Sequence, residues 1–164
     1  MNRLLPLLIG GGLAALLCCA CEERPPVVQP IAYNHKAHID NSIACDACHE
    51  TVQKAAAASV PTTATCMLCH QVALTSSPEE EKVRWYADKG EEIPWRRIYR
   101  IPTHVYFSHR RHVAVARIEC AQCHGNVASL TSPAAYPLVE LTMTWCLTCH
   151  QAHGATQDCI HCHR

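Results

Sequence analysis

A chain of 164 residues with 13 cysteines, 12 histidines and one phenylalanine does not have the composition of an ordinary globular domain. Its formal net charge is zero at pH 7 and its lysines and arginines form no long run, which argues against a nucleic-acid partner. A cytosolic enzyme keeps few cysteines, and disulfide bonds in a secreted protein would leave the histidines unexplained. Cysteine and histidine together indicate a metal or a metal-containing cofactor.

The first 20 residues are predicted to direct export. Arg3 precedes an apolar run over residues 4–17, and a charged, proline-rich stretch follows over residues 22–26. The apolar segment is at the short end of what spans a bilayer. We therefore predict a signal peptide over residues 1–20.

Cys21 is the predicted site of lipid attachment. It follows Ala20 at the end of the export segment, as in a bacterial lipobox, although Cys18 stands where that pattern prefers leucine. An uncleaved membrane helix is the alternative, and a disulfide bond among Cys18, Cys19 and Cys21 is a third. Residues 21–32 are then a lipid-anchored tether on the periplasmic side of the bacterial cytoplasmic membrane.

Every cysteine after residue 21 belongs to the pattern Cys-x-x-Cys-His, which occurs five times. In the attachment sequence of c-type haem, two cysteines form thioethers with the porphyrin and the next histidine is the proximal iron ligand. The predicted attachment residues are Cys45, Cys48, Cys66, Cys69, Cys120, Cys123, Cys146, Cys149, Cys159 and Cys162. The predicted proximal ligands are His49, His70, His124, His150 and His163.

Paired cysteines at this spacing also bind zinc or act as thioredoxin-like redox pairs. Neither kind of site needs a histidine directly after the second cysteine, whereas all five motifs have one. Haem is attached outside the cytoplasm, so the export signal agrees with this interpretation. We predict five haem c groups as the cofactors.

The number of motifs determines the predicted architecture. Removal of residues 1–20 leaves 164 minus 20, or 144, residues, fewer than 30 for each haem. Separate helical domains around each haem do not fit, so the haems must pack against one another and take the place of a hydrophobic core. The predicted fold is compact and mostly irregular, with short α-helices and the haems forming the core.

Two segments of the chain repeat. Residues 33–39 (YNHKAHI) and 107–113 (FSHRRHV) share the order aromatic, small polar, His, basic, any, His, aliphatic, and two motifs follow each. We predict a two-haem module over residues 33–70 and an inter-module linker over residues 71–103. A second two-haem module with a C-terminal fifth haem is predicted over residues 104–164.

Seven histidines outside the proximal positions are candidates for the sixth iron ligand. In each repeat the two histidines are about one helical turn apart and can reach different haems, or they are surface or propionate-bonding residues. The predicted distal ligands of the four module haems are His35, His38, His109 and His112.

The fifth haem needs a donor from outside its own motif. His104 is predicted and His153 is the alternative, whereas His161 lies inside an attachment loop and is not expected to turn back to an iron. Met143, three residues before Cys146, is either a thioether ligand or a packing residue.

The linker is predicted to contain a helix that begins after Ser77, with glutamates in its first turn. Residues 95–100 alternate aromatic and basic side chains, which suit haem propionates or a partner protein; an ordinary solvated connection is the alternative. Residues 52–58 are predicted as another short helix.

With these motifs in view, residues 33–163 resemble the class III (c3) and cytochrome c7 multihaem proteins. Residues 94–98 (PWRRI), 101–109 (IPTHVYFSH), 120–125 (CAQCHG) and 141–146 (LTMTWC) are similar to the pentahaem subunit of alternative complex III, a quinol-oxidising membrane assembly. That resemblance implies a periplasmic electron-transfer subunit of the respiratory chain rather than an enzyme. Its implied partners are an iron–sulfur or molybdopterin-like subunit and a small cytochrome c or an oxidase.

Two other functions fit the same motifs. A free-standing, lipid-anchored electron carrier would dock only transiently through charge. A multihaem reductase needs an iron with an open position, and seven spare histidines for five irons argue against one.

The five motifs predict five covalently attached haems per chain. We expect intact mass spectrometry and the pyridine haemochrome assay both to give five for the mature protein. A mature, haem-free chain that contains zinc would contradict the interpretation of the motifs.

Overall fold

The computed structural model describes residues 24–163, so the predicted signal peptide and Cys21 lie outside the described residues. The helices are α1 (His35–Asp40), α2 (Cys45–Cys48), α3 (Thr63–Met67), α4 (Pro78–Lys89), η1 (Arg110–Val115), α5 (Cys120–His124), η2 (Val127–Ser129), α6 (Met143–Ala152) and α7 (Cys159–Cys162). Over residues 24–163 there is no strand, and the only β-type pairing is an isolated bridge between Val105 and His163. The predicted fold class, mostly irregular with short helices, is confirmed.

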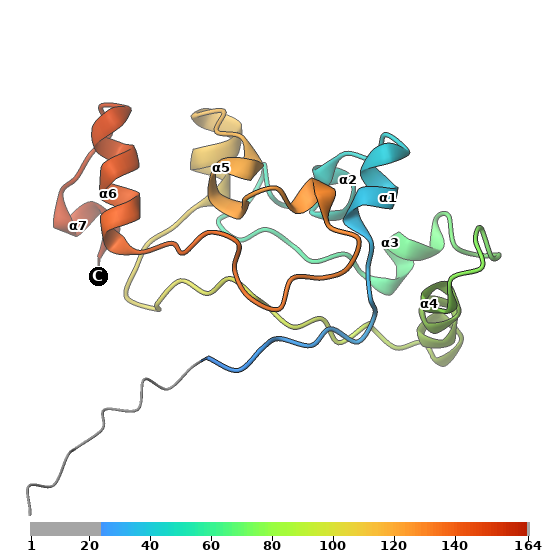
Figure 1. The fold of residues 1–164 in the computed structure, drawn as a ribbon. Coiled ribbons are helices and arrows are strands. Elements are labelled where there is room, and N and C mark those ends of the chain that lie inside the picture. The colour runs from blue at the N-terminus through green and yellow to red at the C-terminus, as the bar shows by residue number, and fades with distance from the viewer. Residues whose placement is uncertain (1–23, 164) are drawn as a thin grey trace, which may run out of the picture.

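Each Cys-x-x-Cys-His motif begins on a helix. Residues at i, i+3 and i+4 share one helical face, so both cysteines and the histidine of a motif lie on the same side. In Figure 1 the motif helices follow one another from right to left in the order α3, α2, α5, α6, α7. We call this series the motif row; its first two members are reversed relative to the chain.

Helix α4 begins where the sequence predicts. The side chain of Ser77 accepts a hydrogen bond from the backbone N–H of Glu79 (3.3 Å), and Pro78 opens the helix. Gly90 ends it with φ of 67°, a left-handed conformation that glycine adopts without strain.

The predicted helix over residues 52–58 is wrong, because residues 51–57 form turns. The carbonyls of Ala55 and Ala56 accept hydrogen bonds from the backbone N–H groups of Arg110 (3.0 Å) and His109 (2.9 Å). Those carbonyls therefore serve the second half of the chain instead of a local helix, and tertiary pairing overrides local propensity.

Within the described residues the buried hydrophobic side chains are few. Ile31, Val83 and Ile93 are buried and form one cluster, against which Met67 and Trp95 pack. This cluster holds α4 and the linker against α3, the first helix of the motif row.

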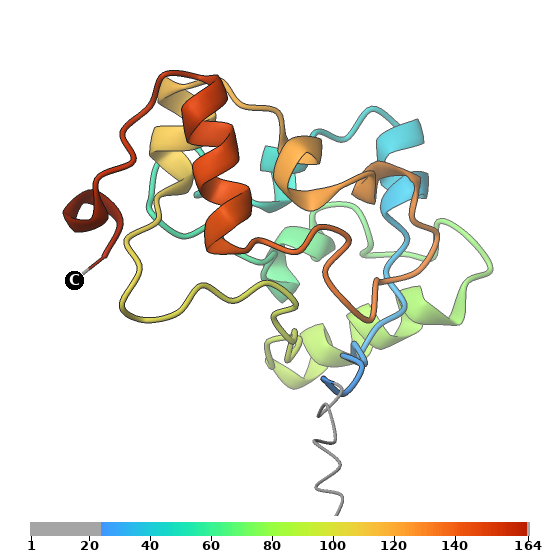
Figure 2. The ribbon, with the colours of Figure 1, turned by 60° about the vertical axis from the view of Figure 1, so that its left-hand side comes forward.

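Extended segments support the motif row from one side. Residues 90–104 run beneath the helices in Figure 1, and the turned view in Figure 2 shows the same segment curving toward the C-terminal helices. The side chain of Gln29 bonds both the N–H and the carbonyl of Arg96, and Val27 N–H donates to the carbonyl of Ala135 (2.9 Å). In the described part of the chain, no helix has the length and apolar character needed to cross a membrane.

Candidate functional site

Each of the five motif histidines lies close to a histidine from elsewhere in the chain. The distances between ring centres are 6.0 Å for His38 and His70, 6.3 Å for His109 and His124, 6.1 Å for His112 and His150, and 5.6 Å for His104 and His163. The fifth pair is His35 and His49. Burial lowers the pKa of His35, and the ring of His49 is close enough to lower it further. The structure thus brings all five predicted distal histidines to motif histidines.

These separations suit a metal ion between two imidazoles. A metal–imidazole bond is about 2 Å long, so rings on opposite sides of one ion have centres roughly 6 Å apart. Among residues 24–163, no three His, Cys, Asp or Glu side chains converge as a metal-binding group. The ring-centre distances place the histidine donors in this part of the chain in pairs.

Backbone carbonyls orient several of these rings. The Nδ1 atoms with a carbonyl partner alone are those of His38 (Asn34, 2.8 Å), His49 (Ser59, 2.7 Å), His112 (Ser108, 2.8 Å) and His150 (Thr156, 2.6 Å). Nδ1 of His109 lies between the carbonyl of Ala56 (3.0 Å) and the N–H of Ala58 (3.2 Å). When Nδ1 donates its hydrogen to a carbonyl, Nε2 carries a free lone pair and can bind a metal.

The sequence repeat is also a repeat of geometry. Tyr33 stacks on His38 with ring centres 4.5 Å apart, and Phe107 stacks on His112 at 4.7 Å. Each aromatic ring also meets the first histidine of its segment edge-on, at 4.7 and 4.9 Å. In each repeat, one aromatic side chain therefore packs against both histidines of that repeat.

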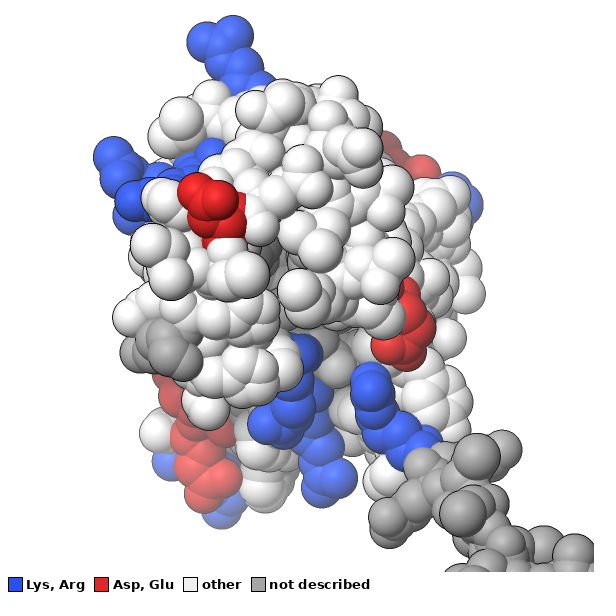
Figure 3. Space-filling view, turned by 90° about the vertical axis from the view of Figure 1, so that its left-hand side faces the viewer, with Lys and Arg blue, Asp and Glu red and all other residues white. Residues whose placement is uncertain are grey.

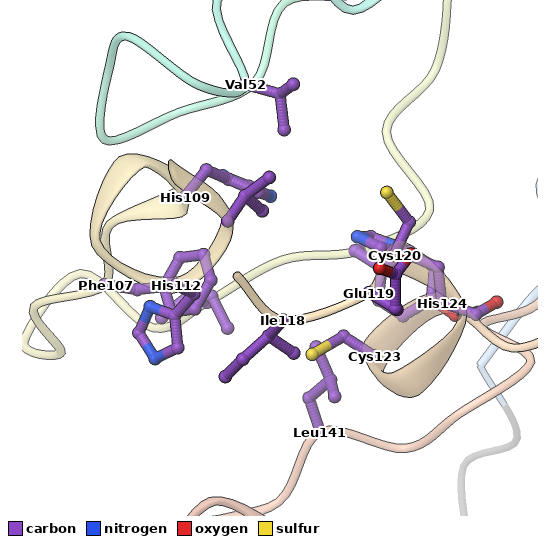
Figure 4. A pocket seen from close by; sticks show the side chains of 13 residues that line it. Val52, Phe107, His109, His112, Ile118, Glu119, Cys120, Cys123, His124 and Leu141 are labelled. Atoms are coloured by element: carbon purple, nitrogen blue, oxygen red, sulfur yellow. Dashed lines mark hydrogen bonds between the residues drawn. The ribbon is translucent and has the colours of Figure 1, made fainter. Parts of the chain in front are cut away.

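One complete site surrounds an apolar hollow of about 680 Å³, counting the solvent at its mouth. Figure 4 shows His109 on one side of this hollow, and Cys120 and His124 on the other. Cys123 also lines the hollow, and the other walls include Val52, Ile118 and Leu141. The donors and the apolar walls fit a large apolar group held through two sulfurs and two imidazoles, as haem c is.

Burial affects the protonation of His124, the motif histidine of this site. It lowers the pKa of His124, as does the nearby ring of His109, so the imidazole is neutral at pH 7. A neutral imidazole is the form that binds a metal.

Neighbouring motifs lie close together through their sulfurs. Burial raises the pKa of Cys66, Cys120, Cys123 and Cys146, and a thiolate of another motif raises each further. The cross-motif pairs are Cys48 with Cys66, Cys45 with Cys120, Cys123 with Cys149, and Cys146 with Cys162. These electrostatic pairs give the same order as the motif row in Figure 1.

The remaining candidates lie away from these pairs. His161 faces Asp158, with Nδ1 and Oδ2 3.4 Å apart, and His153 is exposed at the end of α6. Met143 is 60% exposed in the first turn of α6. In the described part of the chain, none of the three has a ring contact with a motif histidine.

Two aromatic side chains of the linker, Trp95 and Tyr99, face inward, whereas Trp85 is 51% exposed. Trp95 Nε1 donates to the carbonyl of Pro61 (3.1 Å), and the ring of Tyr99 meets His124 edge-on with centres 4.6 Å apart. The Tyr99 hydroxyl accepts hydrogen bonds from the N–H groups of Leu138 (3.0 Å) and Val139 (3.3 Å). The linker is therefore more than a solvated connection, and its aromatic–basic alternation was the signal for this packing.

Sequence patterns did not single out Glu80 in α4. Its side chain is buried, and Oε2 lies 3.6 Å from Nδ1 of His70. The Thr75 hydroxyl, which donates to this carboxylate, holds the pKa of Glu80 below its ordinary value.

Comparison with known proteins agrees with this chemistry. Residues 105–164 match the family described as "Cytochrome c7 and related cytochrome c". The multiheme cytochrome c subunit of a menaquinone reductase from Nitratidesulfovibrio vulgaris is 38% identical to this chain over 98 residues. The aligned region is 58% of this chain and 45% of that subunit, so the chain spans less than half of its relative's length.

We expect Tyr99→Phe to lower the free energy of unfolding by about 1 kcal/mol, because two backbone N–H groups lose their shared acceptor. Chemical denaturation followed by circular dichroism measures the change. Tyr136→Phe is the matched control, since Tyr136 is 47% exposed. Equal stability of the two variants would contradict the role given to Tyr99.

Proposed function

We propose that this chain, whose residues 105–164 form a cytochrome c7-like multihaem domain, is the five-haem electron-transfer subunit of a membrane complex that oxidises quinol. Multihaem electron transfer follows from the family match and from the related menaquinone reductase subunit. The observation that carries the rest is the pairing of every motif histidine with a second histidine.

In this proposal the two cysteines of each motif would hold one haem, and the paired histidines would supply imidazole ligands to its iron. Haem iron held in this way accepts and releases one electron. The carbonyl partners of the Nδ1 atoms keep the rings in place, so the protein reorganises little when the charge of the site changes.

The pairing also separates a carrier from a reductase. A reductase needs one iron with a free axial position for its substrate. Here a second imidazole lies near each motif histidine, as expected of an electron carrier.

The motif row supplies a continuous route for electrons. Cysteines of neighbouring motifs are close enough to influence one another electrostatically, from Cys66 at one end to Cys162 at the other. Helices α6 and α7 form the far end. Figure 3 shows a broad uncharged area on this face, with acidic and basic side chains at its upper left, at its right and across its lower part. Met143 and Ile160 are exposed there (60% and 82%). Such a surface favours a lasting subunit contact over charge-steered docking.

The proposed partners are the other subunits of this complex. The related protein is named as a subunit of a menaquinone reductase, which supports menaquinone or menaquinol as the redox partner of the whole assembly. An iron–sulfur or molybdopterin-like subunit would exchange electrons with one end of the motif row, and a small cytochrome c or an oxidase with the other.

His109→Ala removes the imidazole that lies opposite His124. We expect one haem per chain to become high-spin in electron paramagnetic resonance and to bind carbon monoxide, where the parent shows little of either. His153→Ala is the control, because that ring is exposed and away from the pairs, and it should leave every haem low-spin. A parent with one high-spin haem per chain would favour the reductase, and a fully low-spin His109→Ala would refute the ligand assignment.

We also propose that the mature chain is held at the periplasmic face of the membrane by a lipid on Cys21. Cys21→Ala should release the protein from washed membranes or block its processing, as fractionation and N-terminal mass analysis would show. Cys19→Ala is the matched control and should stay membrane-bound. A fully processed, membrane-bound Cys21→Ala protein would rule out the lipid anchor.

A further inference from the structure

We propose that Glu80 is a positioning residue for His70 and that it gives the haem at Cys66 and Cys69 the lowest reduction potential of the five. The inference rests on the proposed function, because it concerns one of the haems that the motifs would hold. It goes further in assigning different properties to sites with the same attachment sequence.

The geometry around Glu80 directs a buried charge at His70. Glu80 is 7% exposed, and its Oε1 accepts a hydrogen bond from the Thr75 hydroxyl (2.5 Å). Its Oε2 accepts one from the N–H of Leu74 (2.7 Å) and lies 3.6 Å from Nδ1 of His70. Nδ1 of His70 is itself buried and has no hydrogen-bond partner within the described residues. The Glu80 carboxylate is therefore the acceptor toward which this ring hydrogen can turn.

The other oriented rings have a different partner. His49 and His150, two further motif histidines, meet backbone carbonyls, and so does His38 on the opposite side of the same site. A carbonyl is a neutral dipole, whereas a carboxylate carries a full negative charge. A carboxylate at Nδ1 makes the imidazole a stronger electron donor, and this favours the oxidised metal and lowers the potential.

One positive group, the guanidinium of Arg84, weakens the influence of the Glu80 charge on His70. Arg84 lies one turn further along α4, with Nη1 3.8 Å from Oε2 of Glu80. Its guanidinium offsets part of the negative charge, but it has no acceptor for the hydrogen of His70. Of these two groups, only Glu80 can accept the ring hydrogen.

Helix α4 holds Glu80 firmly in place. The residue lies in the first turn of the helix, where the N-terminal end of the helix dipole stabilises a negative charge. Val83, in the next turn, belongs to the buried cluster against which Met67 of α3 packs. The carboxylate and the second motif are thus parts of one packed unit.

The position of the second motif in the motif row determines what the charge of Glu80 means for electron transfer. The second motif is the end of the motif row at α3, so its haem has a neighbouring motif on one side only. A haem of lowest potential at that end would donate electrons to the rest of the row. We infer that α3 and α4 mark the end at which electrons enter the chain.

The test uses the haem-loaded protein and compares Glu80→Gln with Glu81→Gln. Glu81 is exposed on the same helix, so the control removes an equal charge at a different place. Redox titration followed by absorbance resolves the five transitions, and proton NMR of partly reduced samples identifies the haem that moves. We expect Glu80→Gln to shift one reduction equilibrium about tenfold toward the reduced form, or about 59 mV upward for one electron.

Thr75→Val distinguishes positioning from support of the fold. It removes the hydrogen bond to Oε1 and leaves the charge of Glu80 in place. We expect this variant to move the same transition by less than twofold, and Glu80→Asp to restore most of the parent value.

Three outcomes would overturn the inference: five unchanged transitions in Glu80→Gln, an equal shift in Glu81→Gln or Thr75→Val, or a shift at a haem other than the one at Cys66. Failure here would leave the haem count and the low-spin state of the parent intact. Failure of the proposed function would instead appear in the parent before any variant is made.

Discussion

The pairing of histidines across long stretches of chain is the constraint on which the other features depend. His38 must meet His70, His112 must meet His150, and His104 must meet a histidine at the end of the chain. Each pair closes a loop, and loop closure is opposed by chain entropy. Because buried hydrophobic side chains are few in the described residues, we propose that this cost is met mainly by haem binding and by the hydrogen bonds that orient the rings.

The irregular backbone follows from that constraint. A long helix would carry its ligands away from the site, whereas one or two turns suffice to place two cysteines and a histidine on one face. Backbone groups outside the helices are then free to pair with other segments, as the carbonyls of residues 55 and 56 do. The linker follows the same logic, since Tyr99 ties residues 138 and 139 to the ring of His124.

Local patterns identified the residues of the candidate site better than the order of the motifs in space. The Cys-x-x-Cys-His motif is visible in the sequence because its spacing fits a single helical turn. Ser77 likewise indicated the start of α4, because a helix cap depends only on neighbouring residues. The order of the motif row, with α3 before α2, depends on packing between distant segments and has no local signature. Glu80 was missed because a glutamate in the first turn of a helix is usually solvated. The helix expected over residues 52–58 failed for the converse reason, since its carbonyls bind residues more than 50 positions away.

The turn that replaces that helix has a consequence for the order of assembly. If the chain is exported as proposed, it leaves the export channel from its N-terminus, so residues 45–59 would emerge well before residues 109 and 110. Until those later residues arrive, the carbonyls of Ala55 and Ala56 lack their partners, and the loop that carries Ser59, the partner of His49, is incompletely held. On this route the first motif to emerge would not be the first to reach its final form. Its loop would be completed only when a segment more than 50 residues later has folded against it.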